Sequence, residues 1–390
     1  MTNNSVTAWH QFCDSLREAG EFLAGDEFPN SSQTDQAEGV RHLSRMTILA
    51  LTQFVEANNT EFPRFVRQND DVTQWGGNNL DNGYYIAHVD QSSDYRIYGN
   101  ASSASGFILS ARDGYMHENK LACKDLSSAN MQIDDDGNFE VIVSQTEQAG
   151  NWLEMIPGTT QLGIRVYYYN WETETPPVFQ LVKIGNEGLS PPRLSEQLLV
   201  DNLGQAGEWL QCNLLYWNKW MKDRAPHLPV NRVSKPHSVP GGSNEVITYS
   251  GGRYEIGDDE ALVVTFEPIN AEYLGFMLYT DAWFETMDMH NRLGGFNNQQ
   301  LAVDTDGRIR VVITAHDPGV NNWIDNEARS KGLMTLRTIN GDVPPETSSR
   351  LVKISELGAV LPTDTCRLNL QQRREQIMTR REHMVSRFHR

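Results

Sequence analysis

The feature that most constrains this chain is an internal duplication. Residues 14–23 (DSLREAGEFL) and 201–210 (DNLGQAGEWL) are identical at six of ten positions. Further along, residues 136–144 (DGNFEVIVS) are echoed by residues 306–314 (DGRIRVVIT). A repeat of this length means that one structural unit occurs twice.

Further matches follow in the same order in both copies. They are Asn151-Trp152 and Asn322-Trp323, Arg165 and Arg337, Pro176-Pro177 and Pro344-Pro345, Leu-Val-Lys-Ile at 181–184 and 351–354, and the shorter pairs Phe107-Ile-Leu-Ser with Phe276-Met-Leu-Tyr and Tyr95-Arg-Ile with Tyr254-Glu-Ile. We therefore divide the chain into 1–190, a helical segment with a first β-unit, and 191–390, a helix with a second β-unit and a C-terminal basic helix.

Each copy begins with a helical pattern and continues with short strands. Apolar residues from Trp9 to Leu23 recur at spacings of three and four, as they do in 40–55 and 198–221. Residues 84–184 and 246–354 instead show short alternating runs separated by Gly-rich turns. This pattern predicts a mainly β fold with added α: two tandem jelly-roll β-sandwich units, each preceded by helices, plus a C-terminal helix. We place the linker at 185–193 and a second, proline-containing loop at 226–243.

Composition excludes several partners. The chain has 33 Lys and Arg against 51 Asp and Glu, a formal net charge of −18. Nucleic acids and anionic lipid surfaces bind basic proteins, so we expect neither as a partner. No apolar run approaches the ~20 residues of a bilayer span, and no signal peptide pattern begins the chain. Four well-separated cysteines without a CxxC pair indicate reduced thiols, so we expect a cytoplasmic protein.

Several of these segments together resemble a known family. The stretch 76–90 (GGNNLDNGYYIAHVD), then 95–99 (YRIYG), Asp135-Asp-Gly and 151–153 (NWL), resembles domain-of-unknown-function family 1214, over most of the chain from Trp9 to Ile354. The resemblance implies paired jelly-roll sandwiches, distantly like peptide-N-glycanase-type folds and some viral coat proteins. It implies no particular activity.

Signatures of common cofactor and nucleophile sites are absent. The chain has no GxGxxG, Walker loop, HExxH or GxSxG motif, so we predict no cofactor and consider nucleotide-driven chemistry unlikely. A divalent metal would need convergent histidines and a carboxylate. The candidates are His88, His117, His290 and His316, but none has a His-x-His spacing, which favours histidines that bond to solvent.

Polar and aromatic residues gather in three clusters suited to a hydroxylated ligand. The clusters are 78–90, 283–298 and 167–172, and each also has a purely structural interpretation: an Asx-rich turn, a surface helix and a half-buried strand. Residues kept in both copies, such as the Asn-Trp pairs, are expected to serve the fold, because an indole N–H seeks a partner at a sheet edge. Arg165 and Arg337 are expected to pair with a carboxylate. Residues present in one copy are the better functional candidates.

This asymmetry selects the candidate site. We assign catalysis to Glu285 or Asp288 as acid or base, with His88 and His290 as proton relay or ligand orienter. The substrate-binding candidates are Tyr84, Tyr85, Asn82, Asp90, Trp283, Arg292 and Asn297. No metal ligand is assigned.

Function is therefore expected to be enzymatic. The leading hypothesis is a hydrolase-like enzyme that acts on a small polar or glycosylated metabolite by carboxylate and histidine acid–base chemistry, in a cleft near the junction of the two β-units. The alternatives are a non-catalytic binding protein for carbohydrate or a hydroxylated hydrophobic metabolite, a cupin-like metal-dependent enzyme, and a structural or assembly protein.

The C-terminus differs in charge from the rest of the chain. Residues 367–390 contain seven arginines and two glutamates, so they carry +5 while the remainder carries −23. Six apolar residues form an incomplete stripe at helical spacing: Leu370, Ile377, Met378, Met384, Val385 and Phe388. A basic amphipathic helix can bind membranes or calmodulin-like partners. We favour docking on the acidic body or on a second subunit, which would give a homodimer.

Overall fold

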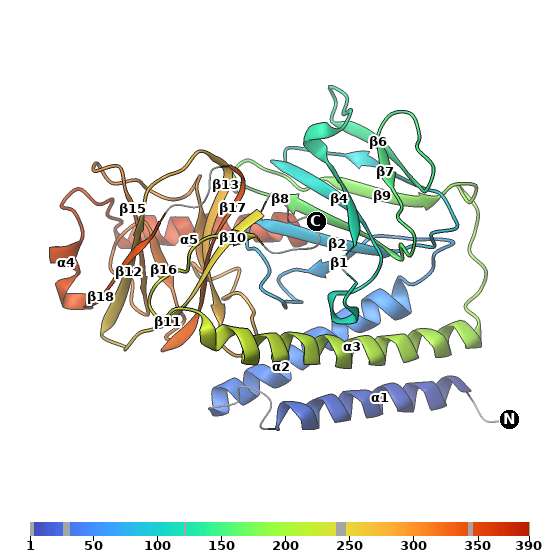
Figure 1. Cartoon of the computed structure of the whole chain (residues 1–390), viewed down its shortest axis with the longest axis horizontal. Helices are drawn as coiled ribbons and strands as arrows, with labels where there is room; N and C mark the ends of the chain where they lie inside the picture. Colours follow the sequence, from blue (N-terminus) through green and yellow to red (C-terminus); the bar gives the residue numbers. More distant parts are fainter. Residues whose placement is uncertain (1–3, 26–31, 121, 239–246, 342–345, 390) are drawn as a thin grey trace.

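The computed structural model describes residues 4–25, 32–120, 122–238, 247–341 and 346–389. Two β-sandwiches lie side by side, and a layer of helices runs along one side of the pair (Figure 1). No helix among the described residues is long and apolar enough to cross a membrane. All four cysteines are free thiols, as expected.

The first sandwich consists of a five-stranded sheet in the order β1-β2-β8-β4-β5 and a four-stranded sheet in the order β7-β6-β3-β9. Its strands are β1 (Val66–Asn69), β2 (Asn82–His88), β3 (Tyr95–Asn100), β4 (Gly106–Arg112), β5 (Cys123–Ser127), β6 (Asn138–Ser144), β7 (Trp152–Glu154), β8 (Gln161–Tyr167) and β9 (Val178–Lys183). Inward-facing residues such as Ile97, Leu109, Val141 and Ile164 fill the space between the sheets.

The second sandwich repeats this order strand for strand. Its sheets run β10-β11-β17-β13-β14 and β16-β15-β12-β18. The strands are β10 (His237–Ser238), β11 (Ile247–Glu255), β12 (Glu260–Phe266), β13 (Ala271–Thr280), β14 (Gly295–Asn297), β15 (Ile309–Thr314), β16 (Trp323–Asp325), β17 (Lys331–Gly341) and β18 (Ser348–Lys353). The predicted duplication and fold class are confirmed, whereas the boundary between 1–190 and 191–390 stays a prediction.

The Asn-Trp pairs hold equivalent strands in both copies. Asn151 Nδ2 donates to Gln132 O and Glu140 O, at 2.8 and 2.9 Å. Asn322 Nδ2 donates to Ala302 O and Arg310 O, at 2.8 and 3.1 Å. The indole Nε1 of the following tryptophan donates to the backbone of the preceding strand, from Trp152 to Ser144 O and from Trp323 to Thr314 O. These residues serve the shared fold, as predicted.

The two repeated arginines behave differently from the expectation. Arg165 on β8 faces Tyr84 on β2, and Arg337 on β17 faces Tyr249 on β11, in matching registers. The guanidinium carbons lie 5.8 and 5.3 Å from the centres of those two tyrosine rings. Cation–π contact replaces the expected carboxylate partner, because tyrosine rings line this part of the sheets.

One short sequence match was wrong. Tyr95 begins β3, whereas Tyr254 lies near the end of β11, which is the counterpart of β2. Three residues are too few to set a register. Pro344-Pro345 and residues 239–243 of the predicted second loop lie outside the described residues, and the predicted linker 185–193 lies between β9 and the next helix.

Three long helices form the layer beside the sandwiches. They are α1 (Asn4–Leu23), α2 (Gln33–Ala50), continued by a π-helical turn Leu51–Glu56, and α3 (Glu196–Arg224). The side chains of Ser32 and Ser195 cap α2 and α3. The repeated segments in α1 and α3 pack against each other, and Gly207 allows this because a Cβ there would lie 2.9 Å from Ser15 Oγ.

The remaining helices are short turns and one long C-terminal helix. The turns are Met116–Glu118, Ser128–Asn130, Ala225–His227, Ile354–Glu356 and α4 (Leu357–Val360). The long helix, α5 (Leu370–Phe388), begins with a capping box between Asn369 and Gln372. In Figure 1 it runs across the second sandwich and ends beside the first.

The buried face of α5 combines basic side chains with two apolar residues of the predicted stripe, Met384 and Phe388. Arg373, Arg380 and Arg387 recur every seven residues and are each only 3% exposed. Leu370, Met378 and Val385 of the predicted stripe point outward and are 46–67% exposed, so the predicted contact face was wrong for them. The guanidinium groups of these arginines lie over aromatic rings and also bond to carbonyl oxygens. The predicted docking of the helix on the body is confirmed, and a homodimer stays a prediction.

Candidate functional site

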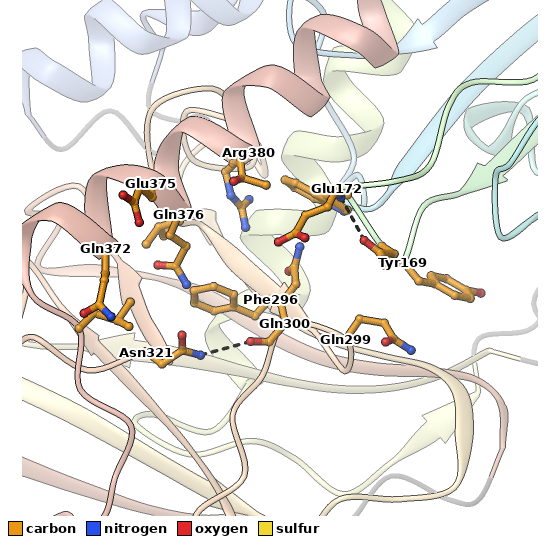
Figure 2. A pocket seen from close by; sticks show the side chains of 15 residues that line it. Tyr169, Glu172, Phe296, Gln299, Gln300, Asn321, Gln372, Glu375, Gln376 and Arg380 are labelled. Atoms are coloured by element: carbon orange, nitrogen blue, oxygen red, sulfur yellow. Dashed lines mark hydrogen bonds between the residues drawn. The ribbon is translucent and has the colours of Figure 1, made fainter.

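A groove of about 470 Å³ lies between α5 and the adjoining edges of both sandwiches. Trp171, in the turn after β8, reaches it from the first sandwich, and Phe296 on β14 reaches it from the second. Arg380 enters from α5 (Figure 2). The groove therefore lies at the predicted junction of the two β-units.

Arg380 is buried but incompletely bonded. Its Nη2 donates to Gly295 O at 2.6 Å, and its guanidinium carbon lies 4.3 Å from the centre of the Trp171 ring. Its Nη1 is buried and has no hydrogen-bond partner among the described residues. Burial lowers the pKa of Arg380 to about 10, opposed by the charge of Asp81 and reinforced by that of Arg387.

Trp171 likewise keeps a free donor. Its ring stacks on His383 with centroids 5.1 Å apart, and Arg380 and Arg387 also lie against it. These contacts already cover the indole ring, which is 6% exposed. Its Nε1 is buried without a partner in the described part of the chain. The ring of this lining residue is therefore covered by other side chains, while its N–H donor is left without a partner among the described residues.

Amides and carboxylates line the rest of the groove. The amide side chains are Asn170, Gln299, Gln300, Asn321, Gln372 and Gln376, and the carboxylates are Glu172 and Glu375. Figure 2 shows Gln376, Glu375 and Gln372 on α5 facing the loops that carry Asn321 and Gln300. Amide groups both donate and accept, so this lining suits a ligand with several hydroxyl groups.

A buried network joins the two sandwiches close to Arg380. Asp81 accepts hydrogen bonds from Tyr273 Oη at 2.7 Å and from Asn297 Nδ2 at 3.0 Å. Burial raises the pKa of Asp81, although the Tyr273 bond and the charges of Arg387 and Arg380 oppose the increase. Asn297 also donates to Tyr169 O at 3.1 Å. The amide nitrogen of this substrate-binding candidate is therefore already bonded at the junction of the two sandwiches.

Glu285 is held in a buried ion-pair cluster with the helical layer. Its Oε1 lies 2.7 Å from His42 Nδ1, and its Oε2 accepts a hydrogen bond from Arg45, both on α2. Trp283 stacks on His42 and donates Nε1 to Asp35 O. These contacts fasten the loop after β13 to α2.

His88 lies in another network. Its Nε2 is 3.0 Å from Tyr115 Oη, which donates to Gln53 on the π-helical turn. Burial lowers the pKa of His88 to about 4. Its Nδ1 has no partner among the described residues. Glu285, His88 and His290 are thus bonded to three separate sets of partners.

The loop around His290 is shaped by its neighbours. Asp288 Oδ1 accepts from the backbone N–H of His290 and Asn291, and Arg292 Nη1 donates to Asp325 at 2.8 Å. Burial favours protonated Asp288, but bonds from Asn291 and His290 lower its pKa overall. His290 Nε2 itself lies 2.7 Å from Asp71 Oδ2.

The first-unit candidates occupy structural positions. Tyr84 Oη accepts from Asn79 N and Asn82 Nδ2, and Tyr85 packs on Phe179 in the core. Asp90 Oδ1 accepts from Ser92, and these backbone and side-chain bonds lower the pKa of Asp90.

Three groove residues came from segments that the sequence analysis did not select for the site. Trp171 and Glu172 lie in the cluster 167–172, which was not selected because a half-buried strand explained its tyrosines. Arg380 lies in the basic tail, which was expected to dock on the acidic body or on a second subunit but supplied no site candidate. A seven-residue arginine spacing (Arg373, Arg380, Arg387) was the available signal.

Comparison with known proteins agrees with the fold. Residues 87–169 match the family described as Protein of unknown function (DUF1214). The matched segment runs from the end of β2 to just beyond β8, within the first sandwich, and confirms the resemblance seen in the sequence. The likeness to peptide-N-glycanase-type folds stays a prediction. No curated protein matches the chain.

Among solved structures, an uncharacterized protein from Burkholderia cenocepacia is similar over 89% of this chain and 97% of its own, with 26% identity and a TM-score of 0.80. That protein therefore shares nearly the whole architecture. A Vibrio parahaemolyticus protein covers 80% of this chain and 97% of its own at 12% identity, with a TM-score of 0.45, too low to support an inference.

Proposed function

We propose that this chain binds a small hydroxylated carboxylate, such as a sugar acid, in the groove between α5 and the two sandwiches. The observation that carries this proposal is the pair of buried N–H donors, Arg380 Nη1 and Trp171 Nε1, that lack partners in the described structure and belong to residues lining the groove. Buried donors are normally bonded, so an oxygen-rich ligand is their natural acceptor.

Charge favours an anionic group at this point. Arg380 and Arg387 are both buried, and among the described residues neither lies within ion-pair distance of a carboxylate. Asp81 influences both from nearby, but its acceptors are engaged by Tyr273 and Asn297. A ligand carboxylate would offset the cost of burying these cations.

The rim favours hydroxyl groups over a second negative charge. Glu172 and Glu375 would repel a phosphate or a dicarboxylate but can accept hydrogen bonds from hydroxyls. A ligand with one carboxylate on a polyhydroxylated chain or ring would place the carboxylate near Arg380 and its hydroxyl groups near Glu172 and Glu375. The proposal is a form of the carbohydrate-binding alternative, and a cytoplasmic location stays a prediction.

Calorimetric titration with glucuronate, glucose and inorganic phosphate tests the proposal. We expect glucuronate to bind at least about tenfold more tightly than glucose, because a hydrogen bond to a charged group contributes more than a neutral one. Arg380→Met should weaken glucuronate binding by about 10- to 100-fold, and Trp171→Phe, which keeps the ring and removes the N–H, by a few-fold. Arg374→Met, on the exposed side of the same helix, is the matched control. Equal binding of glucose, or unchanged binding by Arg380→Met, would reject the proposal.

Hydrolysis is the second candidate function. It is favoured by the presence of two carboxylates, Glu172 and Glu375, in one groove, as acid–base cleavage requires. A panel of aryl glycosides and esters should then give turnover that Glu375→Gln abolishes while Glu285→Gln retains it. If no compound in the panel is turned over, hydrolysis is rejected and ligand binding remains as the proposed function.

A further inference from the structure

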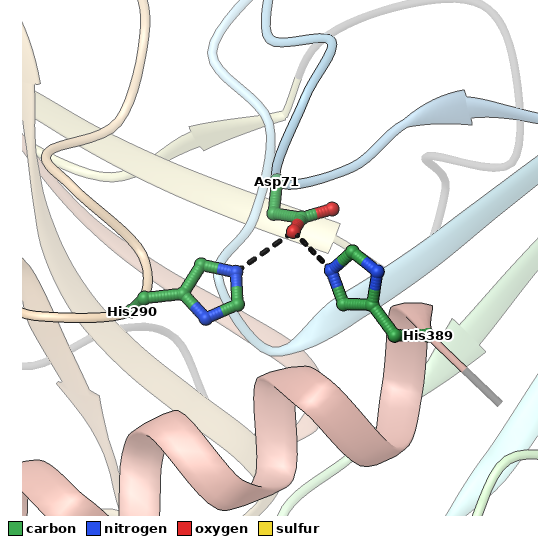
Figure 3. Close-up of side chains that lie close together, drawn as sticks. All are labelled: Asp71, His290 and His389. Carbon is green, nitrogen blue, oxygen red and sulfur yellow. Dashed lines mark hydrogen bonds and ion pairs between the residues drawn. The ribbon is translucent and has the colours of Figure 1, made fainter.

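A second cluster of polar side chains lies where three distant segments meet. Asp71 comes from the loop between β1 and β2, His290 from the loop after β13, and His389 from the residue that follows α5 (Figure 3). Both imidazole Nε2 atoms lie 2.7 Å from Asp71 Oδ2. Figure 3 shows both rings directed at the carboxylate from opposite sides.

The geometry is close to that of a metal site. One ligand atom from each residue lies within 4.8 Å of the other two. A tetrahedral ion with bonds of about 2.0–2.1 Å would place its ligand atoms roughly 3.3 Å apart. Small side-chain rotations would therefore bring the two nitrogens and one oxygen into position around one ion.

Asp71 also shows an unmet bonding capacity. Its side chain is 7% exposed, and its Oδ1 is buried without a hydrogen-bond partner among the described residues. The carboxyl group of an aspartate is ordinarily ionised at neutral pH. An ionised carboxylate with a free, buried oxygen is suited to a cation.

Bonds from neighbouring residues hold two of the three residues, His389 and His290, in place. Arg67 donates to the carbonyl of Phe388, and Arg387 donates to Leu80 O at 2.6 Å, which fixes the end of α5 next to His389. Asp288 holds the backbone of His290. His290 is 21% and His389 48% exposed at the side chain, so one side of the cluster faces solvent.

We infer that Asp71, His290 and His389 form a binding site for a divalent transition-metal ion such as Zn²⁺. Two neutral imidazoles and a carboxylate are ligands suited to zinc, iron and their neighbours in the first row. Three protein ligands leave coordination positions on the solvent side for water or a substrate oxygen. This inference is independent of the groove, whose ligand it does not involve.

Titration of the chelator-treated full chain tests this site. We expect one equivalent of Zn²⁺ to bind and Co²⁺ to give a visible absorption spectrum with imidazole and carboxylate ligation. Because even the loss of a supporting residue weakens metal sites by 10- to 100-fold, His290→Gln and Asp71→Asn should each weaken Zn²⁺ binding at least about tenfold.

Two further variants keep the test decisive. The His389 side chain is 48% exposed, so His389→Gln should leave the fold intact, and it should weaken Zn²⁺ binding to a similar degree. His316→Gln, at an exposed histidine of the second sandwich, is the matched control and should bind Zn²⁺ like the unmodified chain. Absence of stoichiometric Zn²⁺ binding, or equal binding by folded His389→Gln, would overturn the site. Glucuronate binding should be unchanged in all four variants, which separates this outcome from that of the groove.

Discussion

The two sandwiches share their strand order and their Asn-Trp bonds, yet they differ in what covers those bonds. In the second sandwich, Arg373 of α5 lies 5.0 Å from the Trp323 ring centre and bonds to Asp317 and Val320 O. The corresponding surface of the first sandwich is an open groove of about 550 Å³ that includes Asn151. The duplicated strands therefore determine the fold, and the unduplicated helix creates the candidate binding groove.

The largest expected difference between the copies concerns their tryptophans. Trp323 is 7% exposed beneath α5, whereas Trp152 is only partly buried. Trp323→Ala should lower the free energy of unfolding by about 3–5 kcal/mol, and Trp152→Ala by roughly half as much. Urea unfolding of both variants measures this, and equal losses would mean that α5 adds nothing to the second copy.

A matched pair of methionines tests which face of α5 is docked. Met384 is fully buried and Met378 is 49% exposed. Met384→Ala should cost about 3 kcal/mol of unfolding free energy, while Met378→Ala should change it by less than about 0.5 kcal/mol. Thermal or urea unfolding distinguishes them. A large loss of unfolding free energy in Met378→Ala would indicate that a partner covers the outer face of α5.

Equivalent loops fasten each sandwich to the helical layer by different chemistry. The loop after β13 uses Glu285 with His42 and Arg45, while the loop after β4 uses Tyr115 with Gln53 and His88. Glu285→Gln should cost about 3 kcal/mol of stability, because it leaves the Arg45 charge without its anion. Tyr115→Phe should cost about 1 kcal/mol. Chemical denaturation checks both, and a stable Glu285→Gln variant with lost turnover would restore the catalytic assignment.

The first sandwich also carries a buried histidine at a strand position where the second has an arginine. By strand register, Arg253 occupies the place of His88. The folded state lowers the pKa of His88 from 6.5 to about 4, so protonation favours the unfolded state. The contribution of neutral His88 to the free energy of unfolding is present above pH 6.5. It is lost as the pH falls toward 4, at about 1.4 kcal/mol per pH unit. Unfolding free energies of His88→Gln should show a correspondingly shallower pH dependence, and an unchanged slope would refute the burial of a neutral His88.

Repetition made the fold predictable, but the same reasoning did not identify the residues that line the groove. The Asn-Trp pairs and Leu-Val-Lys-Ile segments recur, so their roles could be inferred without coordinates. Glu285 and His88 were selected because each occurs in one copy only. The sequence does not show that Glu285 bonds to α2 or that His88 bonds to Tyr115, because these partners are far away along the chain. Arg380 and Trp171 meet across more than 200 residues, and no local pattern reports such a contact.

The groove can be examined directly through the indole N–H of Trp171. In ¹H–¹⁵N spectra of the full chain, its resonance can be assigned by its absence in Trp171→Phe. We predict that glucuronate shifts this resonance in a saturable manner, that glucose shifts it little, and that Arg380→Met removes the response while Arg374→Met retains it. A Trp171 resonance that does not respond to glucuronate would contradict the assignment of a ligand site to this groove.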